Sequence, residues 1–498
     1  IGGLTFFHSR ASAATNYEGQ KKITFNSDSF SRLKELVERY QKCATTPLLM
    51  SIDAEWGLAM RVENTPQYPY AITLGALPQN KKNLVYQVGK KIGTDLRAAG
   101  INYNLAPLAD INNNPNNPVI GYRSFGENKQ NVTDCALEYL RGLTDAGVIG
   151  CLKHFPGHGN TNVDSHLGLP ILEENAAQLL ENELYPFIKA IENNVDSIMI
   201  GHLAVPKMHD GANTSATLSK VVIEDLLRKQ LNFEGLVISD ALNMHSVSKL
   251  YSIKGQLEWT AFDVGNDILC FAENVPEGIA AILKNARPER IEESYNRIIK
   301  CKTKAGLFDS TPESDTALDF KAADDLNLEI AQNCITKVKG EALNQTILDA
   351  SKKRTLATIS IYKDTNNAFI ETLDKSIALS NYSIANGKGL EHKALLKELA
   401  SYDTLIIALF VPKAKPLNNF DIEPEVIHFL EELLPSKKCV FHLFGNPYAL
   451  SVIKSLVSCD GIIQTYQDFD SFQITAANML LKDENYTGSL PVSINFYK

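Results

Sequence analysis

Short apolar runs alternate with stretches of helical period through the first three hundred residues, and this alternation constrains the fold more than any other feature. Between the runs, apolar residues recur at every fourth position, as at Leu84, Val88 and Ile92, ahead of a helix-ending Gly100. Repeated strand–helix units imply a parallel sheet that is either open or closed into a barrel. The runs predicted as strands are residues 1–7, 47–53, 101–110, 148–155, 196–202, 235–242 and 266–271.

Polar residues at or just past the carboxyl ends of these runs favour a barrel. They are Asp53, Asp110, His154, His202 and Asp240. In a barrel of parallel strands these ends meet at one mouth, where catalytic groups collect. A nucleotide-binding open sheet would need a glycine-rich phosphate loop after its first strand, and none is visible. We therefore expect an α/β fold with a (β/α)8 TIM-type barrel, seven of whose eight strands are visible.

A second α/β domain is expected after the barrel, since 498 residues is long for one core. Residues 309–325 are polar and lack a strand pattern, which is typical of a linker and a connecting helix. Four further strands are predicted at residues 355–361, 403–411, 438–445 and 460–466, with a crossover helix at 422–434. The expected boundaries are 1–310 for the barrel, 311–340 for the linker and connecting helix, and 341–498 for an α/β sandwich domain.

Composition excludes several classes of protein. A net charge of −9 argues against a nucleic-acid or anionic-membrane partner, and no run of apolar residues is long enough to span a bilayer. The eight cysteines form no C-x-x-C pair, so we expect buried reduced thiols. The opening "IGGLTFF" lacks a charged region and a cleavage site, so no targeting segment is expected within this chain. The cytoplasm and a bacterial periplasm both stay open as compartments.

Residues 151–170, "CLKHFPGHGNTNVDSHLGLP", concentrate three histidines in one loop. A metal site is not expected from His154, His158 and His166, because Pro156 and Gly157 interrupt any helix that would align the first pair. The nearby Cys151 lies inside an apolar run, and no second carboxylate cluster is close in the sequence. We therefore predict no metal and no organic cofactor.

An acid–base role is the richer interpretation of the same loop. Asp164 and His166 are two residues apart, so an extended loop projects them to the same side. An aspartate at one imidazole nitrogen fixes the tautomer and supports the imidazolium, which lets the histidine both give and take a proton. The alternative is a simple turn in which Asp164 caps a local N–H.

Asp240 is the second candidate, because it ends an apolar strand and should face the barrel mouth. An ionised carboxylate held there can attack an electrophilic carbon; the alternative is an N-cap of the next helix. Nearby strand ends supply the mixed donors and acceptors that a sugar ring needs, although each could also be a surface or capping residue. These candidate sugar-binding residues are Asp53, Arg61, Arg123, Lys153 and His154, with Glu55 and Trp56 beside them.

These segments resemble glycoside hydrolase family 3, in particular its β-N-acetylglucosaminidase branch of bacterial cell-wall recycling. "KHFPGHGNTNVDSH" is similar to that branch's K-H-F-P-G-H-G…D-S-H loop over its full length. "SDALNM" resembles the family's nucleophile segment, and "IDAEWGLAMR" its D-x-E-G-G-x-x-x-R segment. "GYRSFG", "ATLS", "FGNPYAL" and "GSLPVSI" also fit, so the resemblance covers nearly the whole chain.

The resemblance implies a role for each candidate. Asp240 matches the nucleophile, and His166 matches the general acid/base, oriented by Asp164. Asp53, Arg61, Arg123, Lys153 and His154 match the residues that hold the terminal sugar. Together they imply a retaining exo-β-N-acetylglucosaminidase (a β-N-acetylhexosaminidase) that forms a covalent glycosyl-enzyme on peptidoglycan-derived fragments.

Two departures from the family pattern stand out. Trp56 replaces the first glycine of E-G-G, where its indole either narrows the aglycone side or offers a stacking face. Family members also begin with one more strand–helix unit, so the first barrel strand is expected to be absent from this chain. The alternatives are a β-glucosidase or broader exo-glycosidase, a phosphorolytic relative, a metal-dependent hydrolase, and a non-catalytic sugar-binding protein on the same scaffold.

Overall fold

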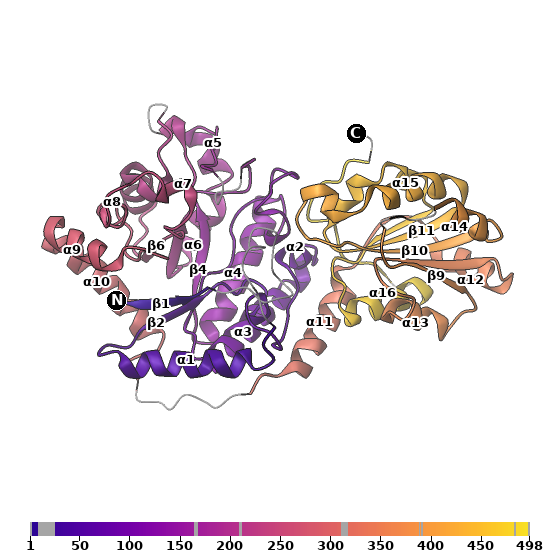
Figure 1. The fold of residues 1–498 in the computed structure, drawn as a ribbon, viewed down its shortest axis with the longest axis horizontal. Helices are drawn as coiled ribbons and strands as arrows, with labels where there is room; N and C mark the ends of the chain where they lie inside the picture. Colours follow the sequence, from indigo (N-terminus) through magenta and orange to yellow (C-terminus); the bar gives the residue numbers. More distant parts are fainter. Residues whose placement is uncertain are drawn as a thin grey trace. The chain divides into compact units, whose positions relative to one another are not determined.

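The chain forms two compact units in the computed structural model. Unit 1 comprises residues 1–71 and 83–323, and unit 2 comprises residues 72–82 and 324–498. Figure 1 draws the chain coloured along its sequence. The residues that the structure describes are 2–7, 25–163, 168–208, 212–309, 317–387, 389, 392–482 and 485–496.

The sheet of unit 1 has six parallel strands that follow one another in sequence order. The seventh predicted run, residues 266–271, adds a parallel bridge between Ile238 and Ile268. This order is that of a TIM-type barrel, as predicted. The strands are β1 (Gly3–Phe6), β2 (Leu49–Ile52), β3 (Tyr103–Asn104), β4 (Ile149–Phe155), β5 (Ser197–Ile200) and β6 (Leu236–Ser239).

Every residue of β2 to β6 is buried, because one face of the wall fills the barrel and the other packs against helices. The interior also holds a polar contact, the Tyr103 hydroxyl 2.6 Å from the Ser197 hydroxyl. The buried interior cluster contains Tyr103, Leu105, Ile149, Cys151, Met199, Leu236, Ile238, Cys270, Cys301 and Ala305.

Helices α3 and α4 show how the outer layer packs. A Cβ at Gly89 on α3 would lie 2.3 Å from the Tyr139 carbonyl oxygen on α4, so only glycine allows this approach. Helix α3 carries the predicted four-residue period, and Gly100 after it has φ +74°. The helices of unit 1 are α1 (Ser29–Cys43), α3 (Asn83–Ala98), α4 (Lys129–Asp145), α5 (Ala176–Glu181), α6 (Tyr185–Glu192), a π-helix (Val221–Gln230), α7 (His245–Ser248), α8 (Gln256–Asp263), α9 (Val275–Asn285) and α10 (Pro288–Lys304).

Unit 2 contains a six-stranded sheet in the order β7-β12-β11-β10-β8-β9. All neighbours pair in parallel except β7, which runs antiparallel to β12. The four predicted strands correspond to β8, β10, β11 and β12, whereas β7 and β9 were not predicted. The strands are β7 (Thr336–Lys339), β8 (Leu356–Ile361), β9 (Ser380–Ile384), β10 (Thr404–Phe410), β11 (Lys438–Phe444) and β12 (Gly461–Gln464).

Both missed strands lie at sheet edges and alternate exposed residues with buried or half-buried ones, so neither forms an apolar run. Strand β7 falls within residues 311–340, which were predicted to be linker and connecting helix. The helix of that segment is α11 (Phe320–Cys334). The segment therefore also supplies one edge of the second sheet.

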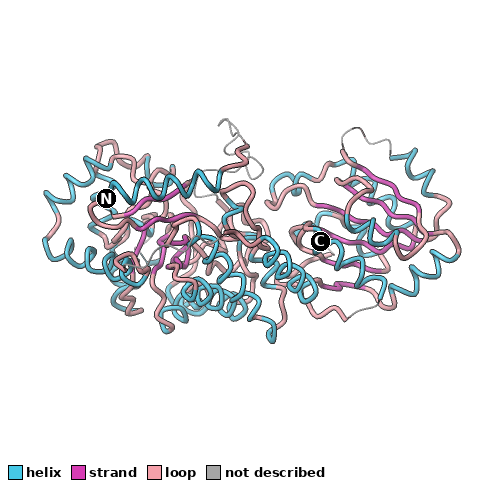
Figure 2. The backbone as a smooth tube through the Cα atoms, turned by 90° about the horizontal axis from the view of Figure 1, so that it is seen from below, coloured by secondary structure: helices cyan, strands magenta, loops and turns pink. Residues whose placement is uncertain are grey.

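Helices cover both faces of the second sheet, which gives a three-layer α/β sandwich (Figure 2). Helices α12 (Leu343–Lys352) and α13 (Ala368–Asp374) pack with α16 (Asp470–Lys482) on one face. Helix α14 (His392–Leu399) contacts α15 (Pro424–Leu433) on the other.

Residues 72–82, which include most of helix α2 (Ala71–Gly75), belong to unit 2 although they lie between β2 and α3 in sequence. Their polar contacts show why. The Gln467 side-chain amide donates to the Thr73 hydroxyl at 2.7 Å, and the Ser489 backbone N–H donates to the Ala76 carbonyl at 3.1 Å. Unit 2 is therefore discontinuous in sequence.

The cysteines match the prediction of unpaired thiols: all eight are free, and all but Cys43 are buried. Within the described ranges, no helix is both long and apolar enough to cross a bilayer.

A buried charge network fixes the carboxyl-terminal part of unit 1. The Asp267 side chain is fully buried and accepts hydrogen bonds from three arginines, a serine hydroxyl and a backbone N–H. Burial lowers the pKa of Arg228 to about 10, and two neighbouring guanidinium groups add to this effect. Asp267 thus supplies the negative charge that stabilises these three neighbouring guanidinium groups. The donors are Arg228 at 2.7 Å, Arg290 at 3.2 Å, Arg297 at 3.1 Å, Ser294 at 2.6 Å and the Val237 N–H at 3.0 Å.

We expect Asp267→Asn to lower the free energy of unfolding of unit 1 by about 3–5 kcal/mol, because it leaves buried cations without their anion. The control Asp225→Asn removes an exposed carboxylate paired with Lys229 and should cost less than about 1 kcal/mol. Urea unfolding followed by tryptophan fluorescence measures the effect, since Trp56 and Trp259, the two tryptophans of the chain, both lie in unit 1. Equal losses in the two variants would contradict the prediction.

Candidate active site

The predicted polar residues lie at the carboxyl ends of consecutive parallel strands. Asp53 directly follows β2, Lys153 and His154 lie near the end of β4, and Asp240 directly follows β6. A parallel bridge between Leu108 and Lys153 continues the sheet beyond β3 toward Asp110. Because the strands run in one direction, these residues share one edge of the wall.

Lys153 sits at the centre of an ion cluster. Its Nζ lies 2.9 Å from Asp53 Oδ1 and 2.9 Å from Glu55 Oε1, and its side chain is 2% exposed. Each carboxylate has a second cation. Arg61 contacts Asp53 at 3.2 Å, while Arg123 donates two hydrogen bonds to Glu55, at 2.7 and 2.9 Å. The structure thus brings together four predicted sugar-binding residues around a carboxylate, Glu55, that was not assigned to the site.

The cluster keeps its groups charged. Burial alone would raise the pKa of Asp53, but Lys153 and Arg61 outweigh it and hold that pKa below its ordinary value. Burial acts likewise on Glu55, and there Arg123 and Lys153 lower the pKa strongly. In return, Asp53 and Glu55 raise the pKa of Lys153 against the effect of its burial. The mouth therefore presents fixed donors and acceptors, which suits a ligand rich in hydroxyl groups.

Asp110 organises the histidine loop. Its fully buried carboxylate accepts from the backbone N–H groups of His154, at 3.1 Å, and of His158, at 2.7 Å. Its Oδ2 lies 2.7 Å from His154 Nδ1, which fixes the orientation of that ring. His154 is the fifth predicted sugar-binding residue, and Asp110 is the residue that positions it.

His158 contacts its own loop through one ring nitrogen. Its Nδ1 lies 2.6 Å from the Thr161 hydroxyl, and its Nε2 is buried without a hydrogen-bond partner among the described residues. Asp164 and His166, the predicted acid–base pair, lie outside the described residues. Their roles remain predictions from the sequence.

His202 supports the turn that carries Asp240. The Asp240 backbone N–H donates to the Ile200 carbonyl at 3.0 Å, and its Oδ1 accepts from the Ala241 N–H at 2.7 Å. Fully buried His202 contacts the Ala241 carbonyl through Nε2 at 2.9 Å and the Thr217 hydroxyl through Nδ1 at 2.8 Å. It thereby joins the ends of β5 and β6. The sequence marks His202 as a strand-end residue, but its positioning role needs the fold.

The Asp240 carboxylate interacts electrostatically with two buried side chains, Cys270 and His158. Burial raises the pKa of the Cys270 thiol, and the charges of Asp53 and Asp240 raise it further. Asp240 also acts on His158, opposing the fall in its pKa. A buried thiol and a buried imidazole thus both interact electrostatically with the Asp240 carboxylate, which follows β6 at the same edge of the wall as Asp53.

Trp56 packs into an aromatic cluster. Its ring centroid lies 4.9 Å from Tyr70 and 6.0 Å from Tyr122, and these tyrosines are 4.8 Å apart. Trp56 is buried, and both tyrosine rings contact its indole. Glu55 precedes Trp56 in the chain, and Arg123 follows Tyr122. The aromatic cluster therefore supports the part of the wall that carries these two charged residues.

A family model described as the N-terminal domain of glycosyl hydrolase family 3 matches residues 1–301. The chain belongs to glycosyl hydrolase family 3. The resemblance expected from the histidine loop and the "SDALNM" segment is thereby confirmed.

Three relatives show where this family 3 chain stands. It is 31% identical over 332 residues to Beta-hexosaminidase A of Pseudoalteromonas piscicida, covering 61% of this chain but only 55% of that protein. It is 30% identical over 287 residues to a Beta-hexosaminidase of Hydrogenovibrio crunogenus, covering 57% of this chain and 79% of that protein. The solved family 3 β-N-acetylglucosaminidase of Paenibacillus sp. superposes with a TM-score of 0.76 at 26% identity, covering 94% of this chain and 91% of that one.

We expect the free energy of unfolding of the family 3 barrel to decrease as the pH is lowered, because His158 titrates differently in the folded and unfolded chain. Burial and the neighbouring His154 lower the pKa of His158 from 6.5 to about 4, so the folded ring stays neutral while the unfolded ring gains a proton. Stability is therefore complete above pH 6.5 and is lost toward pH 4, at up to about 1.4 kcal/mol per pH unit.

His158→Asn keeps an N–H donor in place of Nδ1 and removes this titration. Tryptophan-monitored urea unfolding between pH 7 and pH 4 should show a steeper loss for the wild type, by about 3 kcal/mol in all. Parallel pH profiles for the two proteins would show that His158 does not titrate as described.

Proposed function

We propose that this chain is a retaining exo-β-N-acetylglucosaminidase that hydrolyses terminal β-linked N-acetylglucosamine. The observation that carries the proposal is the ion cluster around Lys153, which shares the carboxyl edge of the parallel strands with Asp240. The names of the relatives from Pseudoalteromonas, Hydrogenovibrio and Paenibacillus support the N-acetyl sugar as the substrate. Peptidoglycan-derived fragments are the proposed source of that sugar.

The ion cluster and His154 bind the terminal sugar. Asp53 offers acceptor oxygens, while Lys153, Arg61 and Arg123 offer donors, so each sugar hydroxyl meets a partner of either kind. Because the charges already pair with one another, they are held in place before the sugar arrives. A site fixed in this way loses little conformational entropy on binding.

The proposed reaction has two displacements at the anomeric carbon. Asp240 attacks that carbon while His166, oriented by Asp164, protonates the departing oxygen, which leaves a covalent glycosyl-enzyme. His166 then removes a proton from water, and the resulting hydroxide displaces Asp240 from the sugar. Two inversions retain the configuration.

The local structure suits Asp240 to this role. The Ala241 N–H fixes one carboxylate oxygen at 2.7 Å, and His202 holds the carbonyl of the same residue. The turn after β6 is therefore held by the hydrogen bond to the Asp240 carboxylate and by the contact with His202, which follows β5. A nucleophile held in this way approaches the anomeric carbon in a defined direction.

The deciding assay compares p-nitrophenyl β-N-acetylglucosaminide with p-nitrophenyl β-glucoside, each with and without EDTA. We expect a higher kcat/KM for the N-acetyl sugar, with no loss after chelation. Asp240→Asn should show no turnover of either substrate, and the exposed Asp225→Asn should match the wild type. Preference for the glucoside, loss with EDTA or an active Asp240→Asn variant would each overturn part of the proposal.

His166→Ala should slow substrates with poor leaving groups far more than activated aryl glycosides, because only the former need a proton on the departing oxygen. The measurement is kcat/KM across a series of aryl β-N-acetylglucosaminides of graded leaving-group pKa. A uniform loss across the series would remove His166 from the role of acid.

A further inference from the structure

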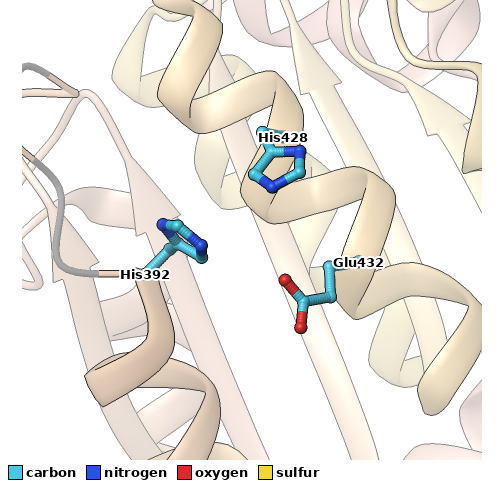
Figure 3. Close-up of side chains that lie close together, drawn as sticks. All are labelled: His392, His428 and Glu432. Atoms are coloured by element: carbon cyan, nitrogen blue, oxygen red, sulfur yellow. The ribbon is translucent and has the colours of Figure 1, made fainter.

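A group of three side chains of metal-ligating types lies in unit 2, on helices that the proposed function does not use. His428 and Glu432 are four residues apart on α15, so they share one face of that helix. His392 is the first residue of α14. Figure 3 shows the three side chains pointing into the same space between the two helices.

One donor atom from each side chain lies within 4.8 Å of the other two. The ring centroids of His392 and His428 are 5.3 Å apart and the rings stand at 83°. Around a tetrahedral zinc ion, bonded nitrogen and oxygen atoms lie about 3.4 Å from one another. His428 and Glu432 are exposed and His392 is partly exposed, so rotation of the side chains suffices to close the remaining gap.

The donor set selects the type of ion. Two imidazoles and one carboxylate suit zinc and similar divalent transition metals, whereas calcium and magnesium prefer sites made wholly of oxygen. Three protein ligands leave a fourth position for water, which an exposed site readily supplies. Among the described residues this is the single such cluster of three or more histidine, cysteine, aspartate or glutamate side chains.

We propose that His392, His428 and Glu432 bind a zinc-type divalent ion that ties the start of α14 to the second half of α15. The two helices differ in how the core holds them. Helix α15 buries Val426, Phe429, Leu430 and Leu433, whereas in α14 only Leu399, at its far end, is buried. The ion therefore stabilises α14 at the end that the core does not hold.

Zinc titration of the full chain by calorimetry tests the site. The wild type should bind one zinc ion that both His428→Ala and His392→Ala weaken by at least about tenfold. The matched control is Glu425→Gln, which removes an exposed carboxylate from the same helix outside the cluster and should bind like the wild type. Unchanged binding in the histidine variants, or no saturable binding in the wild type, would overturn the proposal.

Amide hydrogen exchange in α14 is a second measurement, and zinc bound elsewhere on the chain would not change it. Adding zinc should slow amide exchange in α14 of the wild type and of Glu425→Gln, but not in His428→Ala. Equal slowing of α14 in all three proteins, or none in any, would show that no ion joins the two helices. Since the cluster belongs to unit 2 and the residues assigned to the sugar belong to unit 1, glycosidase activity should be the same in all three.

Discussion

The barrel mouth depends on the ion pairs that the buried ammonium group of Lys153 forms with two carboxylates. Removing an ammonium group from water costs several kcal/mol, and a single carboxylate offsets this cost only with good geometry. Lys153 has two carboxylates, each at 2.9 Å. Each of those is in turn paired with an arginine. Loss of Asp53 or Glu55 leaves an arginine without its carboxylate, and loss of Lys153 or of an arginine leaves a carboxylate with one cation instead of two.

This dependence links the fold to the chemistry. Asp53 and Glu55 follow β2, Lys153 lies on β4, and Arg123 lies in the loop before α4, so the ion cluster fixes three separate parts of the wall relative to one another. The same mouth is braced by Asp110 beneath the histidine loop and by His202 between β5 and β6. A site with charges and rings held by such partners is already arranged for the transition state, and little reorganisation accompanies the reaction.

Much of this arrangement was predictable, because the signals are local. Apolar runs that end in a polar residue identify strands of a parallel barrel, and they indicated Asp53, Asp110, His154, His202 and Asp240 as strand-end residues. Glu55 was not assigned, since spacing alone does not show that both carboxylates of "DAEW" contact Lys153. The edge strands β7 and β9 lack an apolar run, and the pairing of His392 with α15 joins positions far apart in sequence. Only the folded chain brings such residues together.

The placement of residues 72–82 has a consequence for how this chain can be inherited and divided. Ile72, Leu74 and Leu77 are each 2% exposed, and their burial belongs to unit 2 although their codons lie inside the stretch that encodes the barrel. A single cut near residue 310 would leave these apolar side chains on the barrel fragment without the partners that cover them. Recombination that exchanges the carboxyl-terminal half between relatives must therefore keep this short internal segment matched to it.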